Sequence, residues 1–113
     1  MIKGLRGATT WSEDLNNLLP FYRDLLGLPV AIQIPGFVVL GERGAPALAL
    51  GTHSEVRGRN ADPARHIVGL GSDDVDADWK RLKAAGVEFV GQRGRSSIYV
   101  KDPNGYTLEL YVD

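Results

Sequence analysis

Few residues in this chain are able to do acid–base or metal chemistry. There are two histidines, His53 and His66, and no cysteine, so thiolate metal sites and cysteine nucleophiles are excluded. Glu109 stands between Leu108 and Leu110, and in a strand its side chain points away from theirs. If the leucines pack under a helix, the carboxylate points into a cavity on the other face of the sheet. There it is either a hydrogen-bond acceptor or general base for a ligand, or a carboxylate that is paired with an arginine or solvated.

Aromatic residues in the predicted strands are the second group of candidates. Thr9 and Trp11 share one face of the first strand with Gly7, and an exposed indole is suited to stacking on a planar ligand. Packing in a dimer interface is the alternative for Trp11. Three further aromatic residues lie in or beside strands, and we expect at least one to line a cavity: Phe37, Tyr99 and Tyr106.

Composition excludes several functional classes. The chain has 113 residues, a formal net charge of −1 and 43% hydrophobic residues. It therefore predicts one domain, with no basic surface for nucleic acid or an anionic membrane. No stretch approaches the 18 apolar residues of a membrane span. We expect a soluble, cytoplasmic protein.

Periodicity and turn residues predict the elements that position these side chains. A helix is expected to start at an Asn17 N-cap, which puts Pro20 in the first turn, where its missing N–H costs nothing. A second helix runs from Val75 through Trp79 and Leu82 to the stop at Gly86. The expected strands are residues 2–12, 30–34, 37–41, 47–50, 67–71, 87–90, 97–100 and 106–112.

An internal repeat organises these elements. Asp14-Leu15 matches Asp74-Val75, and 48–50 matches 108–110, both with a shift of 60 residues. Each half reads βαβββ: module one covers about 1–51, a polar linker about 52–65, and module two about 66–113. One helix cannot cover both faces of a four-stranded sheet, so we expect paired modules to enclose a cavity between their open faces.

Five motifs follow one another along the chain: Glu13-Asp14-Leu15, 21–28, 73–77, 82–89, and Asp102-Pro103-Asn104-Gly105 followed by Glu109. Together they resemble the vicinal oxygen chelate superfamily, which includes glyoxalase I, bleomycin- and fosfomycin-resistance proteins and extradiol dioxygenases. The resemblance implies an α+β glyoxalase/bleomycin resistance/dihydroxybiphenyl dioxygenase fold. Its two βαβββ modules would form a cupped sheet, paired as a homodimer, that holds a small organic molecule. Catalytic members of the family usually chelate substrate oxygens on a divalent metal.

The resemblance also implies where metal ligands would stand: at Gly7, Ala49, the 66/67 position and Glu109. Gly7 and Ala49 have no ligand atom, and His66 is one residue away from the expected position, which in a strand is the opposite face unless a bulge restores it. Catalytic zinc sites typically use three protein ligands. We therefore predict no cofactor. The alternative is a divalent metal held by His66, Glu109 and an unidentified third ligand such as His53.

The sequence thus favours a metal-free protein that sequesters or carries a small molecule, similar to bleomycin-resistance proteins. Bleomycin itself does not fit, because a strongly cationic drug favours more carboxylates. The predicted ligand-binding residues are Thr9, Trp11, Phe37, His66, Tyr99 and Glu109. One alternative is a metal-dependent lyase, isomerase or dioxygenase using His66 and Glu109. The others are a metal-free enzyme with Glu109 as base, and a subunit whose fold serves only association.

Overall fold

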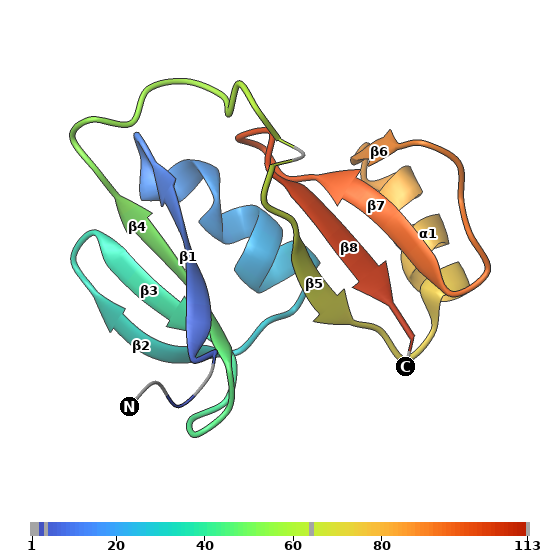
Figure 1. Ribbon diagram of the computed structural model, residues 1–113, viewed down its shortest axis with the longest axis horizontal. Helices are drawn as coiled ribbons and strands as arrows, with labels where there is room; N and C mark the ends of the chain where they lie inside the picture. The colour runs from blue at the N-terminus through green and yellow to red at the C-terminus, as the bar shows by residue number, and fades with distance from the viewer. Residues whose placement is uncertain (1–2, 4, 64, 113) are drawn as a thin grey trace. The chain divides into compact units, whose positions relative to one another are not determined.

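The chain forms two compact units, residues 1–58 and 59–113 (Figure 1). The computed structural model describes residues 3, 5–63 and 65–112. Among these residues, each unit has a four-stranded sheet, which is accompanied by a 3₁₀ turn and a π-helix in the first unit and by an α-helix in the second.

The first unit has a mixed sheet with strand order β1-β4-β3-β2. The edge strand β1 runs parallel to β4, and the other neighbours are antiparallel. Its elements are β1 (Gly7–Ser12), η1 (Leu15–Asn17), η2 (Pro20–Leu25), β2 (Val30–Ile34), β3 (Phe37–Leu40) and β4 (Ala47–Thr52).

The second unit repeats this topology with strand order β5-β8-β7-β6, and again the edge strand β5 is parallel to β8. Its elements are β5 (Val68–Gly71), α1 (Val75–Ala84), β6 (Glu88–Val90), β7 (Ser97–Lys101) and β8 (Thr107–Tyr111). Among the described residues, no helix has the length and apolar character needed to span a bilayer.

The first helical segment differs from the predicted α-helix. Asn17 is the last residue of the 3₁₀ turn η1, so the predicted N-cap at Asn17 is wrong. The turn is capped by Asp14, and the π-helix η2 begins at Pro20. Proline is tolerated at this first position because its missing N–H would have no helical partner. The i→i+5 bond from the Leu26 N–H to the Phe21 carbonyl, at 2.9 Å, marks the wider turn.

The second helix is the α-helix that the sequence predicts. The Asp74 side chain caps it by accepting the Ala77 N–H at 3.1 Å. Asp76 and Lys80 form an i, i+4 ion pair at 3.0 Å. The chain leaves the helix through Gly86, whose φ of +80° favours glycine.

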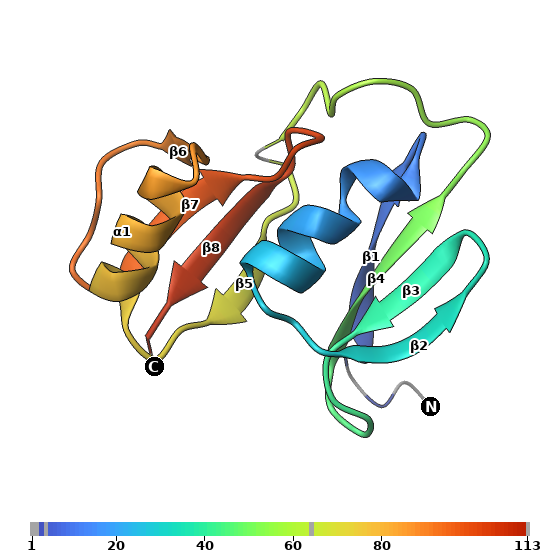
Figure 2. The ribbon, with the colours of Figure 1, turned by 180° about the vertical axis from the view of Figure 1, so that it is seen from behind.

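Each helix covers one face of its own sheet, and the other face carries no helix (Figures 1 and 2). We call the latter the helix-free face. Strand alternation places the core on the covered side. The buried strand residues there are Val38, Leu40, Leu48 and Leu50 in the first unit, and Ile98, Val100, Leu108 and Leu110 in the second.

The repeat extends to the strand register. Thr9 is paired with Ala49 across β1 and β4, and Gly69 is paired with Glu109 across β5 and β8. Gly69 and Glu109 stand 60 residues after Thr9 and Ala49, so the two modules pair their strands in the same register. The predicted α+β architecture of two βαβββ modules is therefore confirmed, with a 3₁₀ turn and a π-helix in place of the first α-helix.

The segment predicted as a linker is divided between the units. β4 continues to Thr52, beyond the predicted end of module one at residue 51, and the units separate after Gly58. The Asn60 N–H then donates to the Asn104 carbonyl at 2.7 Å. Backbone hydrogen bonding thus attaches the second part of the segment to the turn before β8.

Candidate functional site

Trp11 lies over a glycine on the helix-free face of the first sheet. Its partner across β1 and β4 is Gly51, and a Cβ atom added to Gly51 would lie 2.4 Å from Trp11 Cζ3 and 3.1 Å from Phe37 Cδ2. The Trp11 and Phe37 rings have centroids 6.2 Å apart. The absence of a side chain at Gly51 is therefore what allows the indole to rest on the sheet. We call Gly51, the Trp11 and Phe37 rings above it and His53, whose ring contacts Trp11, the Trp11 surface.

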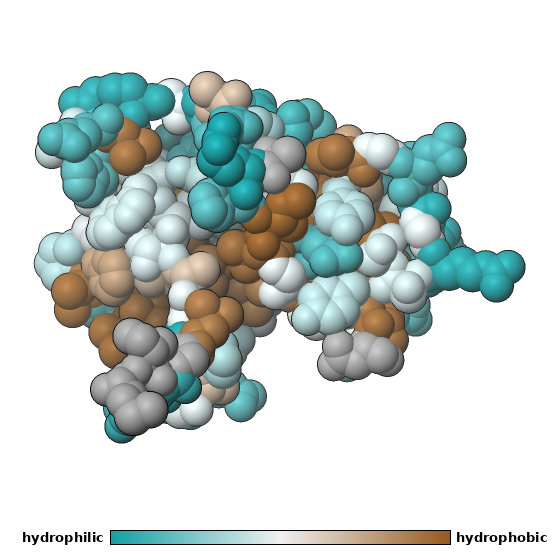
Figure 3. All heavy atoms as spheres, viewed as in Figure 1, coloured by the Kyte–Doolittle hydropathy of each residue, from teal (hydrophilic) through white to brown (hydrophobic). Residues whose placement is uncertain are grey.

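The Trp11 surface is apolar and accessible. Trp11 is 37% exposed and Thr9 beside it is exposed. On β2, Ile32 and Ile34 pair with Val39 and Phe37 and are 48% and 54% exposed. The space-filling view shows hydrophobic (brown) side chains at the surface at its lower left, where Figure 1 draws β2 (Figure 3). An exposed indole can stack on a planar organic molecule, and exposed aliphatic side chains elsewhere on the same face add to its apolar area.

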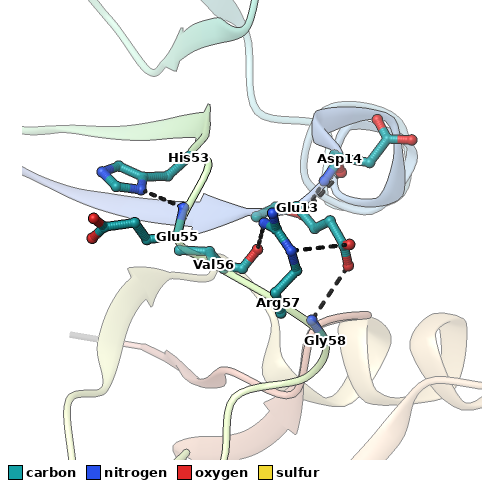
Figure 4. Close-up of polar contacts among 8 residues, drawn as sticks. Glu13, Asp14, His53, Glu55, Val56, Arg57 and Gly58 are labelled. Atoms are coloured by element: carbon teal, nitrogen blue, oxygen red, sulfur yellow. Dashed lines mark hydrogen bonds and ion pairs between the residues drawn. The ribbon is translucent and has the colours of Figure 1, made fainter.

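His53, which entered the sequence analysis only as a candidate third metal ligand, belongs to this surface. Its ring meets Trp11 edge-on with centroids 5.5 Å apart. Its Nδ1 accepts the Glu55 N–H at 3.1 Å, so the ring is held by its own turn (Figure 4). The turn is also tied to the end of β1, because the Gly58 N–H donates to Glu13 Oε2 at 3.4 Å. No periodic pattern in the sequence signals this contact.

The second sheet presents a carboxylate and a phenol on its helix-free face. Leu108 and Leu110 are buried, so the side chain of Glu109 lies on the other side of β8, as alternation predicts. Tyr99 is its partner across β7 and β8, and the Tyr99 hydroxyl donates to Glu109 Oε2 at 2.9 Å. The pair joins two of the predicted ligand-binding residues.

The hydrogen bond to Glu109, and then the negative charge of that carboxylate, raise the pKa of Tyr99 above that of free tyrosine. We expect the phenol to remain a hydrogen-bond donor throughout the neutral range. In an ultraviolet titration, the Tyr99→Phe difference should show Tyr99 ionising above pH 10. Because the folded state holds this proton more tightly, its stabilising effect is complete at neutral pH and declines as pH rises beyond about 10.

Glu109→Gln should lower the ionisation pH of Tyr99, since the charge is removed while the side chain keeps its shape. An unchanged titration in that variant would contradict the pairing.

The residues at the family's metal positions do not fit a metal. A Cβ atom at Gly7 would lie 2.4 Å from the Ala47 carbonyl oxygen, so the backbone there leaves no room for a ligand side chain. Ala49 is buried and has no donor atom. His66 lies just before β5, in an exposed stretch outside the strand. Among residues 3, 5–63 and 65–112, no group of three or more His, Cys, Asp or Glu side chains is placed to hold an ion.

The remaining candidates have local roles. The Tyr106 N–H donates to Asp102 Oδ1 at 2.9 Å, and burial raises the pKa of the Tyr106 phenol. Four arginines in loops pair with carboxylates of the same unit: Arg57 with Glu13, Arg59 with Glu88, Arg65 with Asp62 and Arg93 with Asp76.

Comparison with known proteins places this fold. A search of curated proteins gives no match. Among solved structures, a possible glyoxalase from Bacillus cereus is 23% identical, with a TM-score of 0.74 over 97% of this chain and 99% of that chain. Glyoxalase I of Leishmania major is 21% identical, with a TM-score of 0.80 over 98% and 87%. The fosfomycin resistance protein FosX of Listeria monocytogenes is 26% identical, with a TM-score of 0.73 over 100% and 95%.

The family model described as Glyoxalase/Bleomycin resistance protein/Dioxygenase superfamily matches residues 8–110. That match spans both βαβββ modules and includes Trp11, Tyr99 and Glu109. The chain therefore belongs to the Glyoxalase/Bleomycin resistance protein/Dioxygenase superfamily.

Proposed function

We propose that this protein binds a small, planar organic molecule without a metal, as a sequestration or resistance protein does. The observation that carries the proposal is the Trp11 surface. Its indole is 37% exposed, lies over Gly51 and contacts the rings of Phe37 and His53. Burial of an aromatic ligand there gains apolar contact area and favourable ring–ring geometry.

Two further observations support binding without a metal. The positions that would supply ligands on the first sheet are Gly7 and Ala49, which contribute no donor atom. The remaining carboxylate, Glu109, is held by the Tyr99 hydroxyl. FosX, to which this chain is similar, is described as a fosfomycin resistance protein, which accords with the resistance part of the proposal alone. We further propose that the protein acts in the cytoplasm as a homodimer, as is common in this family.

Tryptophan fluorescence provides the direct test. In a Trp79→Phe background the signal comes from Trp11 alone, since the chain has two tryptophans. We expect planar aromatic compounds to change this emission, and a bound compound to raise the melting temperature by about 5 °C or more at one hundred times its Kd. Trp11→Leu should weaken binding about tenfold. A library that leaves both emission and melting temperature unchanged would contradict the proposal.

Melting-temperature measurements with added metal ions distinguish this function from that of a metal-dependent enzyme. After dialysis against a chelator, Ni²⁺ and Mn²⁺ should leave the melting temperature unchanged, because one carboxylate with one phenol is a poor donor set for either ion. Stabilisation by a stoichiometric ion that is lost in Glu109→Gln and His66→Ala would instead favour the metal-dependent alternative.

A further inference from the structure

Glu109 is a half-buried carboxylate that forms no ion pair with any Lys, Arg or His of the described residues. Its Oε2 accepts the Tyr99 hydroxyl at 2.9 Å. None of the ion pairs among the described residues includes Glu109. A partly desolvated carboxylate is stabilised by charge-assisted hydrogen bonds or an opposite charge, and the phenol supplies only one such bond. Oε1 remains available to a donor from outside the protein.

The cations of this sheet are engaged elsewhere. Lys101 lies on the same face as Tyr99, two residues further along β7, and pairs with Glu88 Oε2 at 3.4 Å. Arg59 contacts Glu88 Oε1 at 3.5 Å. Glu88 therefore holds both of these positive charges, and neither of them forms an ion pair with Glu109 in the described part of the chain.

Aromatic rings flank Glu109 on two sides. Tyr99 stands directly opposite on β7. Gly69, opposite Glu109 on β5, has no side chain, and the Tyr111 ring extends over it: a Cβ atom there would lie 3.0 Å from Tyr111 Cε1. A carboxylate between two phenol rings is a favourable environment for an organic cation, because the ring faces attract positive charge and the carboxylate balances it.

We propose that Glu109, Tyr99 and Tyr111 form a site for the positively charged group of an organic monocation, an ammonium or amidinium. This inference rests on the proposed small-molecule-binding function and names the ligand class. The site offers one carboxylate, so it matches a single charge rather than a polycation. The phenol donor of Tyr99 fixes one carboxylate oxygen, and the other accepts an N–H from the ligand.

Three probes with the same ring test the proposal: benzamidine, benzamide and benzoate, which are cationic, neutral and anionic. Binding to the full chain is measured by calorimetry and by chemical shifts of the amides of β7 and β8. We expect benzamidine to bind about tenfold or more tightly than benzamide, as a charged hydrogen bond provides, and benzoate to bind most weakly. Glu109→Gln should reduce benzamidine to the affinity of benzamide and leave benzamide unchanged.

Glu88→Gln is the matched control, since it removes a carboxylate from the same face that is already paired. It should leave the benzamidine preference in place. Circular dichroism establishes that each variant is folded, and Tyr99→Phe gives a second, milder perturbation that should weaken benzamidine about threefold. Equal binding of the three probes would overturn the cation site, and so would a preference for benzamidine over benzamide that is unchanged in Glu109→Gln. Neither result would contradict the proposed function, which the Trp11 fluorescence experiment tests separately. If no aromatic compound binds and Trp11 emission never changes, the proposed function itself fails.

Discussion

Gly51→Ala should disable the Trp11 surface while the protein still folds. The added methyl group would lie 2.4 Å from Trp11 Cζ3 and 2.7 Å from Cε3, so the indole must leave the sheet. We expect a shifted Trp11 emission in the Trp79→Phe background and a loss of about tenfold in affinity for planar ligands. Overpacking should cost about 1 kcal/mol of unfolding free energy, measured by urea denaturation.

Gly71→Ala is the matched control. Gly71 is the counterpart of Trp11 in the second module, opposite Tyr111, and a Cβ atom there meets nothing within 4 Å. This variant should keep the Trp11 emission and the affinity of the parent chain. If Gly51→Ala binds planar compounds as well as Gly71→Ala does, ligands do not use the Trp11 surface.

Asp102→Ala should destabilise the protein more than removal of an exposed carboxylate does. Asp102 is 2% exposed, and its Oδ1 accepts the N–H groups of Asn104 at 2.8 Å and Tyr106 at 2.9 Å. Alanine leaves these two donors without that acceptor. We expect a loss of about 3 kcal/mol in unfolding free energy, a large fraction of what a domain of this size has. Urea denaturation followed by circular dichroism measures it.

Asp102→Asn tests the reason for that loss. Asparagine keeps an oxygen in the same position, so about half of the stability should return. Asp73→Ala, at an exposed position, should change the unfolding free energy by less than about 0.5 kcal/mol. A loss in Asp102→Asn equal to that in Asp102→Ala would show that the carboxylate charge, rather than the two backbone hydrogen bonds, stabilises the turn.

This turn also connects β7 to β8, the strands that carry Tyr99 and Glu109. The Asp102 N–H donates to the Tyr106 carbonyl at 2.9 Å and the Gly105 N–H to the Asp102 carbonyl at 3.0 Å. These bonds fix the register that sets Tyr99 opposite Glu109. We therefore expect any Asp102 variant that shifts the register to lose the raised pKa of Tyr99 as well.

Local patterns alone determined several features of this protein. Alternation placed the Glu109 side chain on the opposite face of its strand from Leu108 and Leu110. It also placed Trp11 and Thr9 together on one face of the first strand. A side chain's face depends only on the period of the strand, which neighbouring residues reveal. The repeat of 60 residues fixed the two-module architecture for a similar reason: both halves have the same order of turn, helix and strand signals.

The tertiary structure decided which of these side chains meet. Tyr99 bonds to Glu109, Trp11 lies over Gly51 and His53 contacts Trp11, because strand pairing brings distant segments into one register. That register is set by packing and turn geometry across the sheet, not by any residue's own sequence neighbours. The first helix shows the same limit. Periodicity indicated a helix around Pro20, but burial of Phe21 and Tyr22 accompanies a π-helix, whose wider turn an α-helical spacing does not predict.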